Sequence, residues 1–405
     1  MYMNKTKHKG HGLRNAVIVI VAVVAVIFLG NMAMNKLVHT SYSDLNSRDQ
    51  EMLSQLNSLY SATAGNNEMW QGYDLNKSPI VFVAKGDHLN FKDESINLIR
   101  GTAYAVNVKG LENKAYAQKI TMPKGYRLQN VYRLSAVTPG ILKTWSPLGN
   151  FSSISDNMSL GTSKHVFYFK YNKKVLNNAA KTDYYLLPLL SHEFFHYDMQ
   201  QNWSTDEPVS YEEESAQWYS LLGLRYKVMD RLLAGATHGT FTSTDENISD
   251  YVRVTAALKA ASPKMFRKLM NIETAEGTAQ YMSTLASRVA KSPDYTFISD
   301  GRSDKTNFSW CFSYMSTHID RVADIRWLCY DVGAGICFTL NDAEGSTDWQ
   351  KALNSREYKT LNDAVTAYYD SNIGAARYDS LSEIKAKYGF PTIQKEAKTI
   401  YSKLN

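Results

Sequence analysis

The longest run of apolar residues lies near the N-terminus, at residues 16–34, and reads AVIVIVAVVAVIFLGNMAM. A helix of this length can cross a bilayer core about 30 Å thick. The segment before it carries four basic residues and no acidic residue (Lys5, Lys7, Lys9 and Arg14). The positive-inside rule therefore places residues 1–15 in the cytoplasm and the rest of the chain outside. We predict a single-pass protein of the cell membrane, anchored by residues 16–34.

A cleaved signal peptide is the alternative interpretation of this run. The run is long for the apolar core of a signal peptide, and no clear A-x-A cleavage site follows it. We therefore favour an uncleaved signal anchor. Under either interpretation the bulk of the chain is exported.

Residues 36–180 combine a helical pattern with short β-branched runs. Apolar residues recur at helical spacing over residues 44–61, where Ser47 and Gln50 fit a capping box. Runs typical of strands lie between stretches rich in Gly, Ser, Asn and Pro, at residues 79–83, 103–108, 127–134 and 166–171. We predict a mixed α/β N-terminal region.

Residues 181–405 have mainly helical periodicity. Helical patterns begin at Ser210 and end near Gly235, and others cover residues 251–261 and 263–289 and the end of the chain from Trp349. The predicted fold class is therefore α+β, with the mixed region at 36–180 and a mainly helical region at 181–405.

The formal net charge of +6 comes mostly from the N-terminal segment. Without its four basic residues, the chain has 41 basic and 39 acidic residues. An exported part that is almost neutral lacks the strongly basic surface typical of nucleic-acid binding. We expect no nucleic-acid partner.

The three cysteines show no C-x-x-C spacing (Cys311, Cys329 and Cys337). Two interpretations stay open. Cys329 and Cys337 can form a disulfide in an oxidising compartment, which leaves one thiol over, or all three are small buried apolar side chains.

Residues 192–196 read HEFFH, an instance of the HExxH motif. On a helix, His192 and His196 lie one turn apart on the same face, where two imidazoles can bind a single Zn²⁺. Glu193 follows the first His and can act as a general base toward a water molecule at the metal. The motif therefore predicts a zinc-dependent hydrolase site.

The competing interpretation is a pair of core histidines beside Phe194 and Phe195. The apolar run at residues 184–190 indicates that the motif helix is largely buried. Buried imidazoles need polar partners, and a metal ion supplies one for both. We therefore favour the metal site.

A catalytic zinc usually has three protein ligands, so one ligand must come from elsewhere in the chain. Glu212, Glu213 and Glu214 form one candidate group. However, Ser210 and Glu213 fit a capping box, and acidic residues also stabilise the first turn of a helix. A structural role is therefore favoured for this group.

Glu276 is the second candidate for the third ligand. Gly277 follows it inside a helical pattern, where Gly costs about 1 kcal/mol relative to Ala. A close approach of two helices explains such a glycine and would bring Glu276 within reach of a metal on the partner helix. We favour Glu276 as the ligand, with Glu273, one turn earlier, as a residue that orients a His.

The combination of HExxH with a distant E-G-x-A on a later helix resembles the gluzincin-type zinc metallopeptidases, in particular a poorly characterised bacterial branch. The similarity covers most of residues 68–370. Besides the motif helix, it takes in WQGY at 70–73, EGTAQY at 276–281 and YDVGAG at 330–335.

This resemblance implies a zincin-like catalytic region in which Zn²⁺ is bound by His192, His196 and Glu276, with Glu193 as the base. The expected function is hydrolysis of peptide bonds in a peptide or protein substrate outside the cytoplasm. The alternative is a catalytically inactive protease-like domain that binds a partner at the cell surface. The presence of Glu193 argues against it, because binding alone has no use for a general base.

Overall fold

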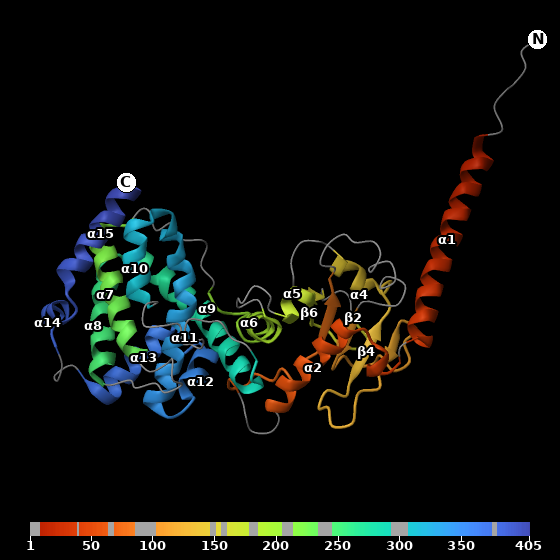
Figure 1. Ribbon diagram of the computed structural model, residues 1–405, viewed down its shortest axis with the longest axis horizontal. Coiled ribbons are helices and arrows are strands. Elements are labelled where there is room, and N and C mark those ends of the chain that lie inside the picture. The colour runs from red at the N-terminus through yellow and green to blue at the C-terminus, as the bar shows by residue number, and fades with distance from the viewer. Residues whose placement is uncertain are drawn as a thin grey trace, which may run out of the picture. The chain divides into compact units, whose positions relative to one another are not determined.

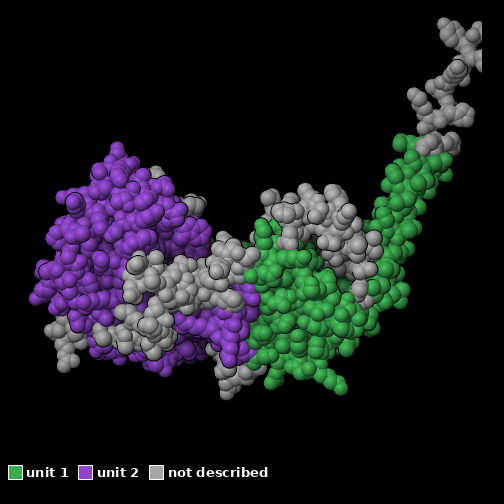
Figure 2. Space-filling model, in the orientation of Figure 1, with its two compact units in different colours: residues 1–61, 74–177 green, residues 62–73, 178–405 purple. Residues whose placement is uncertain are grey.

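The computed structural model describes residues 9–38, 40–63, 69–85, 103–145, 151–154, 160–177, 185–204, 214–233, 245–292, 307–374 and 379–405. The chain forms two compact units, shown in Figure 2. Residues 1–61 and 74–177 form the first, and residues 62–73 and 178–405 form the second. The first contains a six-stranded sheet and the second is helical, which confirms the predicted mixture of helices and strands.

Helix α1 (Lys9–Leu37, red in Figure 1) contains the apolar N-terminal run. Among the described residues it is the one helix long and apolar enough to cross a membrane, over Leu13–Leu37. Its large apolar side chains are solvent-exposed from Leu13 to Leu29. A helix that exposes so much apolar surface is suited to a lipid environment.

The last two turns of α1 have a different character, because they are held by polar contacts within the first unit. Asn31 and Asn35 are buried, as is Arg133 in strand β4 (Val131–Leu134). The guanidinium of Arg133 donates to the side-chain oxygen of Asn35 at 2.9 Å and to the backbone carbonyls of Asn35 and Val38. Arg133 thus places a positive charge at the helix C-terminus, where carbonyls lack helical partners.

The sheet of the first unit has the order β3-β4-β2-β1-β6-β5. Only β1 and β6 pair in parallel, and every other neighbouring pair is antiparallel. The four predicted strands correspond to β1 (Ile80–Ala84), β2 (Ala103–Val106), β4 and β6 (Val166–Tyr171). The two strands that were not predicted are the edge strands β3 (Ala117–Lys119) and β5 (Phe151–Ile154), which are short and carry few buried residues.

Helix α2 (Ser47–Ala62) is held to this sheet by a buried carboxylate. Asp49 accepts hydrogen bonds from the hydroxyls of Tyr104 and Tyr171, each at 2.7 Å. The helix is capped by Asn46, whose side chain accepts from the Asp49 amide at 2.9 Å, and not by the predicted box of Ser47 and Gln50. The short helices of this unit are η1 (Tyr42–Asp44), α4 (Pro139–Leu142), η2 (Lys143–Trp145) and α5 (Lys173–Asn177).

The second unit is built from helices, beginning with α6 (Leu186–Met199), which carries HEFFH. The next helix, α7 (Ala216–Leu232), begins later than predicted. Its cap is Ser215, whose hydroxyl accepts from the Trp218 amide, and not Ser210. The others are α8 (Asp245–Ala261), α9 (Pro263–Ala290), α10 (Phe308–Thr317), η4 (Ile319–Asp324), α11 (Ile325–Glu344), α12 (Asp348–Asn354), α13 (Leu361–Tyr368), η5 (Tyr369–Ile373), α14 (Leu381–Lys387) and α15 (Phe390–Leu404).

An aromatic cluster fixes residues 69–73 to the helices of the second unit. Trp70 is fully buried, and its ring lies 4.9 Å from that of Phe195 on α6 and 5.3 Å from that of Trp349 on α12. Its indole nitrogen donates to the side-chain oxygen of Asn354 at 3.0 Å. The WQGY segment therefore supports α6 from the side that carries Phe195.

Helices α9 and α11 cross in close contact at two glycines. A Cβ atom added to Gly277 would lie 2.3 Å from the Cα of Gly333, and one added to Gly333 would lie 2.0 Å from the Glu273 carbonyl oxygen. The close approach that Gly277 predicts is therefore present, but its partner is α11 and not the motif helix.

We expect Gly277→Ala to destabilise the second unit by about 1–3 kcal/mol. The added methyl would overlap the backbone of α11 at Gly333, which cannot rotate away as a side chain can, so the two helices must separate. Denaturant unfolding of the full chain measures the effect. Gly140→Ala is the matched control, since its Cβ would lie 3.5 Å from Ile154, an ordinary contact. Equal stability of the Gly277 variant and the wild type would show that the crossing is not tightly packed.

Candidate metal centre

Helix α6 presents its apolar side chains to the core and its two motif histidines to α9. Leu190, Phe194 and Phe195 are almost fully buried. The helix begins at Leu186 after Tyr185, so Pro188 lies in its first turn, where its missing amide hydrogen costs nothing.

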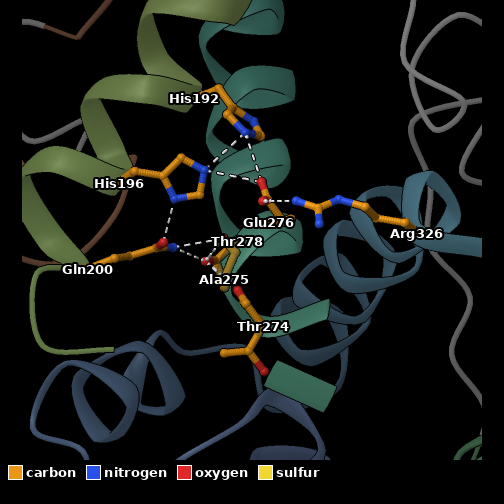
Figure 3. Close-up of polar contacts among 8 residues, drawn as sticks. All are labelled: His192, His196, Gln200, Thr274, Ala275, Glu276, Thr278 and Arg326. Atoms are coloured by element: carbon orange, nitrogen blue, oxygen red, sulfur yellow. Dashed lines mark hydrogen bonds and ion pairs between the residues drawn. The ribbon is translucent and has the colours of Figure 1, made fainter. Parts of the chain in front are cut away.

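Three side chains from α6 and α9 converge, as Figure 3 shows. The Nε2 atoms of His192 and His196 are 3.1 Å apart. Oε2 of Glu276 lies 3.4 Å from the first and 3.2 Å from the second. These three residues form the one group of potential metal ligands found among the described residues. They are the three ligands predicted from the sequence.

The separations between the three atoms match those required by a zinc ion. Zn²⁺ binds imidazole nitrogen and carboxylate oxygen at about 2.0–2.1 Å in tetrahedral geometry, so two ligand atoms should be about 3.3 Å apart. The observed values of 3.1, 3.2 and 3.4 Å bracket that distance. One nitrogen from each imidazole and one carboxylate oxygen therefore lie close enough together to share one metal ion.

The protonation of the two imidazoles differs. Burial lowers the pKa of His192, which favours the neutral form that binds metals. Burial also acts to lower the pKa of His196, but the hydrogen bond and negative charge of Glu276 outweigh it and raise that pKa. The two histidines in turn hold the pKa of Glu276 well below its usual range, although burial opposes them. The carboxylate is therefore ionised and ready to bind a cation.

After the two histidines, Glu193 is the third residue of the HEFFH motif at the site. Burial raises the pKa of its carboxyl to about 7, and the nearby negative charge of Glu276 acts in the same direction. A carboxyl with a pKa close to neutral can both accept and release a proton, as a general base that later acts as an acid must.

Four residues that the sequence analysis did not assign surround the three predicted ligands. Gln200 is hydrogen-bonded to His196, and Gln280 to His192. From α11, Arg326 lies 3.7 Å from Glu276, and the ring of Tyr330 stacks on His192 with 5.6 Å between the centroids. The position of Gln200, four residues after His196 on the motif helix, was a usable signal. Tyr330 begins the YDVGAG segment that the resemblance takes in, although no role was assigned to it there.

The other candidates for the site have different roles or lie elsewhere. Glu273 pairs with Arg225 through two contacts of 2.6 and 2.7 Å and does not orient a histidine. Glu214 accepts from the Ser262 hydroxyl at 3.1 Å. Glu212 and Glu213 lie outside the described residues.

Cys329 and Cys337 do not form a disulfide, so that interpretation of the sequence is wrong. Both are buried thiols on α11. Because the helix rises 1.5 Å per residue, residues eight positions apart are about 12 Å apart along the axis, beyond the reach of a disulfide.

No protein-family model, no curated protein and no solved structure matches this chain. The functional interpretation therefore depends on the geometry and chemistry of the site.

We expect the full-length protein in detergent to bind about one zinc ion per chain. Glu276→Gln keeps the shape of the side chain but removes its charge. Losing a residue that only supports a metal ligand typically weakens metal binding by roughly 10–100-fold. Because Glu276 is a proposed ligand, we expect this variant to lose more than that. Metal analysis and competition with a chromogenic chelator measure both. The matched control is Glu214→Gln, which should bind like the wild type. Absence of zinc from the wild type after reconstitution would contradict the site.

Proposed function

We propose that this protein is a membrane-anchored zinc peptidase of the gluzincin type, which hydrolyses peptide bonds outside the cytoplasm. The observation that carries the proposal is the convergence of His192, His196 and Glu276 at the separations that zinc requires. Glu193 supports a catalytic rather than a purely structural site, because it places a carboxyl with a pKa of about 7 directly after the first ligand.

The three ligands would hold the ion, and the ion would lower the pKa of a bound water and polarise the substrate carbonyl. Glu193 takes the proton from the attacking water and delivers it to the nitrogen of the departing amine. Arg326 lies beside Glu276 and Tyr330 beside His192. Both would be placed to donate to a substrate carbonyl oxygen as negative charge develops on it.

The second part of the proposal concerns α1, which we infer to be a retained membrane anchor. A signal peptidase acting at the end of the apolar run would remove Asn31, which accepts from the buried Ser135 hydroxyl. A cut after Asn35 would also remove two of the acceptors that the buried Arg133 guanidinium has on α1. Breaking such a buried charged network costs several kcal/mol, so the first unit is more stable with the helix attached.

We expect Glu193→Gln to bind zinc like the wild type and to lose about 10²–10⁴-fold in peptidase activity, since the amide cannot accept the proton. A fluorescence-quenched peptide library measures hydrolysis, and metal analysis measures occupancy. Asp198→Asn, at an exposed carboxylate on the same helix, serves as the control. Zinc binding without turnover in the wild type would favour the inactive, ligand-binding alternative.

For the anchor, we expect protein extracted from membranes to keep the residues that precede Gly30. Mass spectrometry of its N-terminal peptides measures this directly. A mature N-terminus beyond residue 30 would contradict the retained helix, since Asn31 begins the polar contacts.

A further inference from the structure

Gln200 links the second predicted ligand to the helix that carries the third. It follows the last residue of α6 and is 5% exposed. Its side-chain oxygen lies 2.6 Å from Nδ1 of His196. Its nitrogen donates to the carbonyl oxygen of Ala275 at 2.9 Å and to the hydroxyl of Thr278 at 2.7 Å, as Figure 3 shows. The two α9 acceptors lie on either side of Glu276 in the sequence.

The surroundings of Gln200 decide which way its amide points. The Ala275 carbonyl can only accept, so the amide nitrogen must face it. The Thr278 hydroxyl donates to the Thr274 carbonyl at 2.7 Å, so toward Gln200 it too acts as an acceptor. The opposite orientation would place the amide oxygen against two acceptors in a buried site, at a cost of about 1–3 kcal/mol for each unsatisfied group.

Once the amide is oriented, the tautomer of His196 follows. Its Nδ1 faces an oxygen that can only accept, so Nδ1 carries the hydrogen. A neutral imidazole protonated at Nδ1 has its lone pair on Nε2, the atom that faces His192 and Glu276. We propose that Gln200 is a positioning residue, which holds His196 in its metal-binding tautomer and in register with Glu276.

The proposal builds on the zinc site described above and adds a requirement for a hydrogen-bond acceptor at position 200 that faces Nδ1 of His196. Asparagine is one methylene shorter and cannot span from His196 to α9. Glutamate can accept from Nδ1 but has no hydrogen to donate to the Ala275 carbonyl, so it keeps the contact with His196 and loses the one with α9. Glutamine satisfies both sides. The hydrogen bond between His192 and Gln280 gives the other imidazole a corresponding partner.

The test measures the zinc affinity of the full-length protein in detergent by chelator competition. We expect Gln200→Met, similar in volume but without hydrogen bonds, to bind zinc about 10–100-fold more weakly. Gln201→Met is the matched control, since that exposed side chain donates only to the Tyr197 carbonyl, and should bind normally. Unchanged affinity in Gln200→Met, with zinc bound by the wild type, would overturn the role of Gln200 but leave the metal site intact.

A second variant separates positioning of the imidazole from simple support of the fold. Gln200→Glu restores the acceptor for Nδ1 but not the donor to α9, so its zinc affinity should recover toward that of the wild type. Equal loss in the Glu and Met variants would overturn the tautomer argument. If the Met variant fails to fold, the Glu variant is compared with the wild type alone, and a loss of about 10–100-fold in its zinc affinity would overturn the argument. No zinc in the wild type would overturn the proposed function, and this inference with it.

One readout is independent of metal. In the metal-free wild type, long-range ¹H–¹⁵N spectra under mildly alkaline conditions should show His196 protonated at Nδ1. Protonation at Nε2 would overturn the proposal whatever the zinc affinity.

Discussion

The close crossing of α9 and α11 at Gly277 and Gly333 is the constraint on which the site depends. Consecutive residues on a helix point about 100° apart, so a residue next to the crossing must face a different neighbour. Gly277 faces the backbone of α11, and Glu276 faces the histidines of α6. One turn of α9 therefore packs against one helix and places a potential ligand toward another.

The two carboxylates of this part of α9 are kept distinct by their partners. Glu273 is neutralised by Arg225, which is fully buried and also donates to Tyr251 at 2.8 Å. Removing either Arg225 or Glu273 would leave a buried, uncompensated charge. The role of this ion pair is therefore structural. Glu276 instead faces two imidazoles and a half-exposed arginine 3.7 Å away. An ionised carboxylate beside two imidazole nitrogens is an arrangement that could hold a divalent cation.

Sequence reasoning succeeded where a local rule determines the outcome. The i, i+4 spacing of His192 and His196 is sufficient to place both on one helix face, and Gly277 signalled a close approach. It failed where tertiary contacts decide. Ser215 caps α7 in place of Ser210, and Glu273, one turn from Glu276, pairs with a buried arginine from α7. The role of Arg326 and Tyr330 depends on how α11 packs, which no local pattern encodes.

Buried polar atoms also bear on the two questions that the sequence left open. For the third ligand, Glu214 has a partner in Ser262, whereas Glu276 lies against the two motif imidazoles and Arg326. For the N-terminal helix, Arg133 takes its acceptors from Asn35 and the end of α1. For Arg133 the relevant quantity is the cost of leaving a buried group unsatisfied, about 1–3 kcal/mol and more for a charge. That cost favours the proposal that α1 is retained, whereas Glu276 is favoured as a candidate ligand by its position between the two imidazoles.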